Sequence, residues 1–145
     1  MSVKAGWSTP LLHVTEVERS IRFYERLGFQ VIDSEGATGC LGWARMHTAD
    51  GSAIMLLLAE PEVHIRPEAQ GIMLVLYTPE LVALREQLIA AGERPGDIEH
   101  PPWMPSGTMM LRDPSGYAVG VHQWGDLEHR VWLERLEKNR AAGAT

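Results

Sequence analysis

The chain has 145 residues and a formal net charge of −6, with 45% hydrophobic and 22% charged residues. This length fits one domain, and the composition is too apolar for a disordered chain. No apolar run approaches the roughly 20 residues that span a bilayer, and no basic cluster points to a nucleic-acid partner. Cys40 is the only cysteine, so no internal disulfide can form and we expect a cytoplasmic protein.

The first half of the chain predicts a strand, a helix and three further strands. Residues 8–14 form a short apolar segment that is typical of a strand. Thr15 and Glu18 have the spacing of a capping box, which predicts the start of a helix, and Gly28 predicts its end. Three more strands are expected at residues 29–33, 41–47 and 52–59.

The second half repeats this order after a linker at residues 60–70. Residues 71–77 predict a strand, and the following helix begins at Thr78-Pro79 and ends before Gly92. Gly28 and Gly92 lie 64 positions apart (92 − 28), an interval that indicates two copies of one supersecondary unit. Proline-rich residues predict a loop at 93–106, and hairpin strands are expected at 108–112 and 117–123.

The tail predicts a charged helix from Asp126 to about residue 140. Leu127, Val131 and Trp132 recur on the side that we expect to pack against the rest of the chain. Trp124 and Trp7 are also expected to pack the chain ends.

Two motifs resemble the glyoxalase/bleomycin-resistance/extradiol-dioxygenase superfamily, also called vicinal oxygen chelate. They are VERSIRFY at residues 17–24, followed by Leu27-Gly28-Phe29, and RDPSGY at residues 112–117. The resemblance implies an α+β fold in which two tandem βαβββ modules form curled sheets around a cleft. The modules would span about residues 8–60 and 71–123, with a helical extension at 126–141, all within one domain of residues 1–145.

Enzymes of that superfamily usually hold a divalent metal on the first and last strands of each module. The resemblance places those positions at Thr9, Met55, Met73 and Gly120, and these residue types cannot bind Zn²⁺, Ni²⁺ or Fe²⁺ in the usual way. We therefore expect no metal and no cofactor, with open space at Gly120.

Three polar residues could still share the cleft, because strand alternation places His13 with Thr9 and His122 with Gly120, while Tyr77 is the repeat equivalent of His13. They could be hydrogen-bonded rim residues, contacts to a ligand, acid–base groups or a relocated metal site.

The aromatic residues indicate a binding protein. Pro102-Trp103-Met104 resembles the loop that lines the drug groove in bleomycin-binding members, and Trp43 lies in the third predicted strand. Flat rings stack on planar ligands, and methionines form adaptable apolar walls. We expect Trp103 and Trp43 to stack on a ligand, unless they are core or dimer-interface residues. Methionines at 55, 73 and 104 would line the site, and the three polar residues above would supply contacts.

The favoured interpretation is a metal-independent protein of the antibiotic-resistance kind that sequesters a small planar, drug-like compound. The net charge weakly favours cationic guests. The alternatives are a glyoxalase- or dioxygenase-like enzyme with a non-standard metal site, and a dimeric protein with no small ligand. We expect a homodimer, with Trp43 and the C-terminal helix at the interface, and neither a membrane nor a nucleic-acid partner.

Overall fold

The structure is a computed structural model that describes residues 3–6 and 8–143. Contacts within the chain divide it into two compact units. The first unit comprises Met1–Ile72 with Arg112–Tyr117, and the second comprises Met73–Leu111 with Ala118–Thr145. Each unit has its own small sheet and at least one helix, so the predicted α+β class is confirmed.

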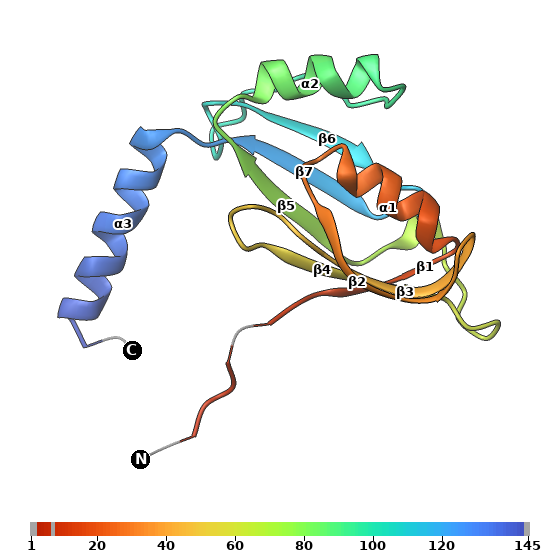
Figure 1. Ribbon diagram of the computed structural model, residues 1–145. Coiled ribbons are helices and arrows are strands. Elements are labelled where there is room, and N and C mark those ends of the chain that lie inside the picture. The colour runs from red at the N-terminus through yellow and green to blue at the C-terminus, as the bar shows by residue number, and fades with distance from the viewer. Residues whose placement is uncertain (1–2, 7, 144–145) are drawn as a thin grey trace. The chain divides into compact units, whose positions relative to one another are not determined.

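The elements of the first unit in chain order are β1 (Leu11–Val14), α1 (Val17–Glu25), β2 (Gln30–Ala37), β3 (Cys40–His47) and β4 (Ala53–Leu58) (Figure 1). The four strands form one sheet with strand order β1-β4-β3-β2. In this sheet β1 is parallel to β4, whereas β3 is antiparallel to both β2 and β4. A short 3₁₀ helix, Pro67–Ala69, follows the sheet.

Strand alternation builds the core of the first unit. Alternate residues of β1, β3 and β4 point to the side where α1 packs, and six of these side chains are almost completely buried. From α1, Tyr24 packs edge-to-face against Phe23 and Phe29, with ring centroids 5.1 and 5.8 Å apart. The buried strand residues are Leu12, Val14, Ala44, Met46, Ile54 and Leu56.

The RDPSGY turn is anchored to α1, which explains why the two sequence motifs occur together. The buried Asp113 carboxylate accepts the Tyr24 hydroxyl at 2.8 Å and the backbone N–H groups of Ser115 and Tyr117 at 2.9 and 2.8 Å. Burial raises the pKa of Asp113, and these hydrogen bonds offset part of the rise. The Tyr117 hydroxyl donates to the backbone carbonyl of His13 at 2.9 Å.

The elements of the second half of the chain are β5 (Met73–Thr78), α2 (Leu81–Ala90), β6 (Thr108–Arg112), β7 (Ala118–Gln123) and α3 (Asp126–Ala141). The sheet of the second unit has the strand order β5-β7-β6, and β5 is parallel to β7. In both units the first strand thus pairs in parallel with the last strand of its module, as a duplicated unit requires. A fourth strand is reduced here to an isolated bridge between Glu99 and Thr108.

The predicted capping box at the start of α1 is wrong. The Glu18 carboxylate accepts the backbone N–H of Leu41, at the start of β3, at 2.6 Å. The N-cap position is Glu16, which makes no side-chain capping bond, and the Thr15 N–H donates to the Ser115 hydroxyl at 3.2 Å. Tertiary contacts therefore replace the local bonds that the sequence predicts.

The expected packing of α3 is also wrong. Leu127, Val131 and Trp132 are 66%, 42% and 46% exposed, and the helix has no buried residue. Eight of the sixteen residues of this helix are Asp, Glu, Lys or Arg, so burying a face of it would also remove charged groups from water. Trp7 lies outside the described residues. Among the described helices, none is long and apolar enough to cross a membrane.

Candidate functional site

One face of the second sheet carries several of the predicted site residues. The parallel register of β5 and β7 places Tyr77 opposite His122 and Val75 opposite Gly120. Because side chains two residues apart point to the same side of a strand, Met73 and Tyr77 of β5 share this face with Gly120 and His122 of β7. The predicted pairing of Tyr77 with His122 is thus present in the second unit.

His122 is the fixed centre of this face. Its side chain is buried, and its Nδ1 lies 2.8 Å from the hydroxyl oxygen of Thr108 on β6. Burial lowers the pKa of His122 below its ordinary value, so the imidazole is neutral at pH 7. The group is therefore an uncharged, oriented ring.

Two aromatic side chains, Trp103 and Tyr77, contact the imidazole of His122, and a third, Trp124, contacts Tyr77. Ring centroids lie 5.6 Å apart for Trp103 and His122, 5.5 Å for Tyr77 and His122, and 4.9 Å for Tyr77 and Trp124. All three pairs are edge-to-face, a favoured aromatic geometry. Trp103 is 66% exposed and Tyr77 57% exposed. We call Tyr77, Trp103, His122 and Trp124 the aromatic cluster.

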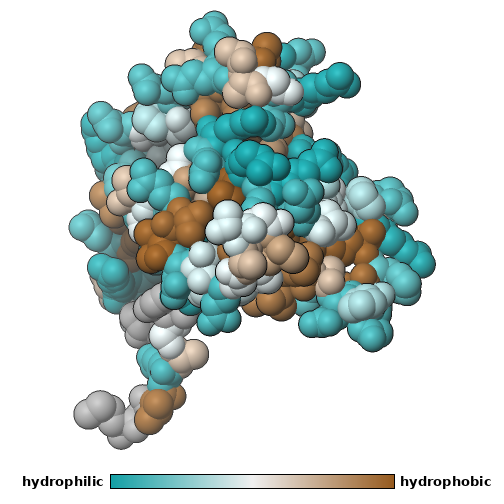
Figure 2. Space-filling view, turned by 45° about the vertical axis from the view of Figure 1, so that its right-hand side comes forward, coloured by the Kyte–Doolittle hydropathy of each residue, from teal (hydrophilic) through white to brown (hydrophobic). Residues whose placement is uncertain are grey.

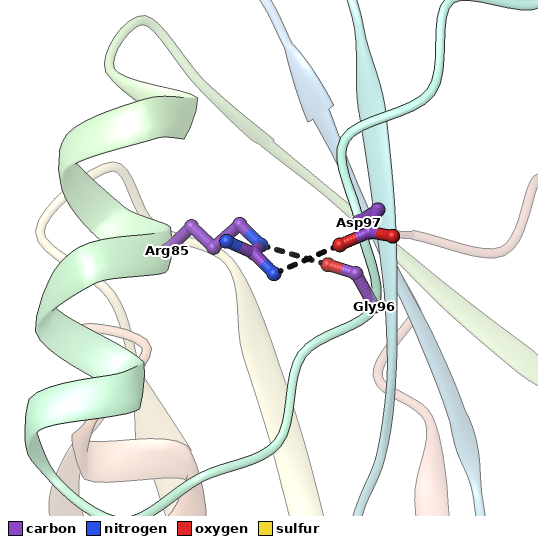
Figure 3. Close-up of polar contacts among 3 residues, drawn as sticks. All are labelled: Arg85, Gly96 and Asp97. Atoms are coloured by element: carbon purple, nitrogen blue, oxygen red, sulfur yellow. Dashed lines mark hydrogen bonds and ion pairs between the residues drawn. The ribbon is translucent and has the colours of Figure 1, made fainter.

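The loop that carries Trp103 is held by α2 and β6. Arg85 of α2 donates from Nε to the Gly96 carbonyl at 2.9 Å and from Nη2 to the Asp97 carboxylate at 3.2 Å (Figure 3). Glu99 then forms two backbone hydrogen bonds of 2.9 Å with the first residue of β6. Trp103 is therefore exposed on a loop that hydrogen bonds to α2 and β6 hold in place.

Methionines fill the space beside Gly120, contrary to the expectation that this position leaves open space. A Cβ at Gly120 would lie 3.4 Å from the Met110 sulfur and 3.5 Å from the Met73 methyl carbon. Met73 is four residues, or about 13 Å, along β5 from Tyr77. Met104 lies in the Trp103 loop, where its N–H donates to the Pro101 carbonyl at 2.9 Å.

In the first unit, the sheet face opposite α1 carries the remaining predicted residues. The register aligns His13 of β1, Leu57 of β4 and Trp43 of β3 in one row. The next row contains Met55 of β4 and Arg45 of β3. The structure thus brings His13, Trp43 and Met55 onto one face.

Trp43 borders a cavity of about 550 Å³ in the first unit. Residues of β2, β3 and β4 and of the segment that follows β4 line the cavity. Its lining residues are Glu35, Gly36, Gly42, Trp43, Leu57, Leu58, Ala59, Glu60 and Pro61. An indole beside such a space can contact a guest molecule.

Sequence reasoning missed two residues of these faces. Trp124 was expected to pack the chain end, yet its ring contacts Tyr77. Arg45 is not among the predicted site residues, although period-two alternation in Trp43-Ala44-Arg45-Met46-His47 places it between Trp43 and His47 on the face opposite α1. The alternation itself was the available signal.

The four residues that the resemblance places at the metal-ligand positions are Thr9 and Met55 in the first unit and Met73 and Gly120 in the second. The sulfur of Met55 accepts a hydrogen bond from Arg45 Nη2 at 3.6 Å. Within the described residues, no three His, Cys, Asp or Glu side chains form a group that could hold a metal ion.

Solved structures show the same fold in antibiotic-binding proteins. A bleomycin-binding protein complexed with bleomycin has a TM-score of 0.65 and 22% identity, covering 83% of this chain and 100% of its own. TnmS3, an antibiotic binding protein from Streptomyces sp. CB03234, has a TM-score of 0.67 and 19% identity, covering 86% and 100%.

The fosfomycin resistance protein FosX from Listeria monocytogenes, complexed with Mn(II) and sulfate ion, has a TM-score of 0.65 and 13% identity, covering 87% of this chain and 95% of its own. These likenesses establish the fold.

No curated protein matches the chain in sequence. The family model of the Glyoxalase/Bleomycin resistance protein/Dioxygenase superfamily matches residues 8–121. Since that match covers most of the chain, this protein belongs to the Glyoxalase/Bleomycin resistance protein/Dioxygenase superfamily.

Proposed function

We propose that this protein binds a small planar organic compound of drug size and withholds it from its target. The observation that carries the proposal is the aromatic cluster, in which Trp103 and Tyr77 are exposed while His122 is buried. Exposed flat rings that are held in place can stack on a planar guest without a large loss of conformational freedom. The drug-binding relatives support this choice of ligand class.

The aromatic cluster has the composition of a small-molecule site. Most of its surface is apolar, and its polar groups are few: the Tyr77 hydroxyl, the indole N–H groups and the imidazole of His122. Because His122 is neutral, the cluster presents no formal charge of its own. Shape and ring stacking would therefore set its selectivity.

Binding in this proposal is independent of a metal. Thioethers at Met55 and Met73, a glycine and one hydroxyl do not provide the nitrogen or carboxylate donors that divalent metals of this superfamily require. The second candidate is an enzyme with a non-standard metal site, because FosX shares the fold and holds Mn(II).

The functional form in this proposal is a cytoplasmic homodimer. Hydrophobic residues reach the surface in several patches between hydrophilic ones (brown and teal in Figure 2). Four of them, Leu127, Val131, Trp132 and Leu133, lie on α3, where the described chain leaves them exposed. Apolar surface of this kind favours association with a second copy.

The test is a calorimetric titration of wild type and Trp103→Ala with a panel of planar antibiotics and dyes. Loss of one stacking ring should weaken any bound compound by roughly ten-fold, or about 1.4 kcal/mol. Val82→Ala is the matched control, because it shortens an apolar side chain of α2 that is exposed to a similar degree as Trp103 and leaves the aromatic cluster intact. Absence of binding throughout the panel, or equal weakening by both substitutions, contradicts the proposal.

A further inference from the structure

Buried polar atoms without partners gather on one face of the first unit. The described residues contain five buried side-chain nitrogen or oxygen atoms that make no hydrogen bond. One is the hydroxyl of Ser20 on α1. The other four are Thr9 Oγ1, His13 Nδ1, Arg45 Nε and His47 Nε2. Native structures satisfy nearly all such atoms, so four on one face indicate a missing partner.

The strand register places these groups opposite the helix-covered core. On β3, Arg45 and His47 alternate with the buried Ala44 and Met46, so both point away from α1. Their Cα atoms lie about 7 Å apart along the strand. Trp43 lies at the same spacing on the other side of Arg45. This order of imidazole, guanidinium and indole is the β3 stripe.

Arg45 is the only permanent charge of the β3 stripe, and it has no counter-ion. Its one hydrogen bond is the 3.6 Å contact from Nη2 to the Met55 sulfur, a weak acceptor. No ion pair of the described chain involves Arg45. Asp33 is its cross-strand neighbour on β2, but this carboxylate is exposed and accepts the N–H of Ser34 at 2.9 Å.

A partly buried guanidinium with free donors is suited to one kind of partner. Removing a charge from water costs free energy that a charge-assisted hydrogen bond recovers. A guanidinium offers five N–H donors in a planar fork that matches the two oxygens of a carboxylate or another oxyanion. The same positive charge repels a divalent metal ion. His47 adds a donor when its proton is on Nε2.

We infer that Arg45, with His47 beside it, binds an oxyanion group of the ligand while Trp43 contacts the ligand's ring. The ligand class is therefore a planar aromatic carboxylate or a similar oxyanion. The β3 stripe lies in the first unit, so this site is separate from the aromatic cluster of the second unit, and the inference goes beyond the proposed function.

The local charge outweighs the net charge of the protein here. The net charge of −6 favours cationic guests through a diffuse field, which physiological salt screens beyond about 8 Å. A guanidinium in direct contact acts well inside that distance. Asp33 and Glu35 of β2 are the cross-strand neighbours of Arg45 and Trp43, and within the described residues neither carboxylate forms an ion pair with Arg45.

The experiment compares three probes: a naphthalene carboxylate, the corresponding neutral carboxamide, and inorganic sulfate. Nuclear magnetic resonance follows the Nε–H signal of Arg45, which is assigned by its loss in Arg45→Met. The carboxylate should bind about ten-fold more tightly than the carboxamide, since one charge-assisted hydrogen-bond pair distinguishes them. Arg45→Met should abolish that preference, and Arg45→Lys should retain part of it.

Arg22→Met is the matched control, because it removes the same charge from an exposed position on α1 and should leave the preference intact. Equal binding of carboxylate and carboxamide, or a preference that survives Arg45→Met, overturns the oxyanion site and leaves the binding function standing. If sulfate alone shifts the Arg45 signal, the oxyanion site stands and the contact of Trp43 with an aromatic ring is overturned. If no probe binds, the oxyanion site and the Trp43 contact are both overturned, and the calorimetric titration of Trp103→Ala still decides the proposed function.

Discussion

Replacing Tyr24 by Phe removes one hydroxyl and keeps the ring that packs against Phe23 and Phe29. The lost interaction is the 2.8 Å hydrogen bond to the buried carboxylate of Asp113. A hydrogen bond to a charged group contributes about 1.5–3 kcal/mol, so we expect the free energy of unfolding to fall by about 2 kcal/mol. Tyr117→Phe is the matched control: its hydroxyl donates to a neutral backbone carbonyl, and about 1 kcal/mol is expected.

The loss in Tyr24→Phe should depend on pH. Burial raises the pKa of Asp113 in the folded state above its unfolded value, so ionised Asp113 costs the folded state free energy at neutral pH. That cost disappears as the pH falls through the raised pKa and the group takes up its proton. Removing a hydrogen bond that stabilises the ionised form raises this pKa further. The deficit of Tyr24→Phe relative to wild type should therefore be largest near pH 7 and shrink toward acid pH.

Urea denaturation at several pH values measures this difference directly. A deficit that stays constant with pH, or one no larger than that of Tyr117→Phe, would refute the assigned role of Asp113 as the carboxylate that anchors the RDPSGY turn to α1.

Gly116→Ala should lower the free energy of unfolding by more than about 2 kcal/mol, because φ at Gly116 is +87° and the new Cβ would lie 2.3 Å from the Cα of Pro67. Gly28→Ala, at φ +97° with open space around it, should lower it by about 1 kcal/mol, and thermal unfolding compares the two. Arg45→Met should leave the free energy of unfolding unchanged or raise it by about 1 kcal/mol, since it removes a buried nitrogen that has no partner, and a clear loss of stability would show that Arg45 serves the fold. Arg85→Ala should lower the free energy of unfolding by less than about 1 kcal/mol, because the Asp97 side chain of the ion pair is 95% exposed and the bond from Arg85 to the Gly96 carbonyl is also exposed. A larger loss in denaturant would contradict that expectation.

Much of the fold could be predicted from the sequence, since its signals are local. Apolar alternation defines the strands, and Gly28 and Gly92 end the first two helices at positive φ. The helix starts could not be predicted in this way. Glu18 bonds the N–H of Leu41, and the Leu81 N–H that opens α2 donates to the side chain of Gln123, 42 positions away. Such partners meet only after the sheets form.

The candidate site could be predicted in part for the same reason. Tyr77 and His122 were paired through the repeat and strand alternation, which both depend on spacing. The contact between Trp103 and His122 also requires the path of residues 93–106, which prolines and tertiary bonds determine. Arg45 is a charged residue within a mostly apolar predicted strand, which the sequence does show. That its Nε is buried without a hydrogen-bond partner is visible only in the structure.

Native mass spectrometry, on protein purified without chelator and mixed with the antibiotic and dye panel, tests the central claim most directly, because it reports ligand, metal and subunit number together. We predict a dimer that binds one planar compound per subunit and carries less than one metal ion in ten subunits, an order-of-magnitude limit expected for positions without metal-binding donors. A tightly held equivalent of Zn²⁺, Ni²⁺, Fe²⁺ or Mn²⁺, or the absence of any bound compound, would contradict the account.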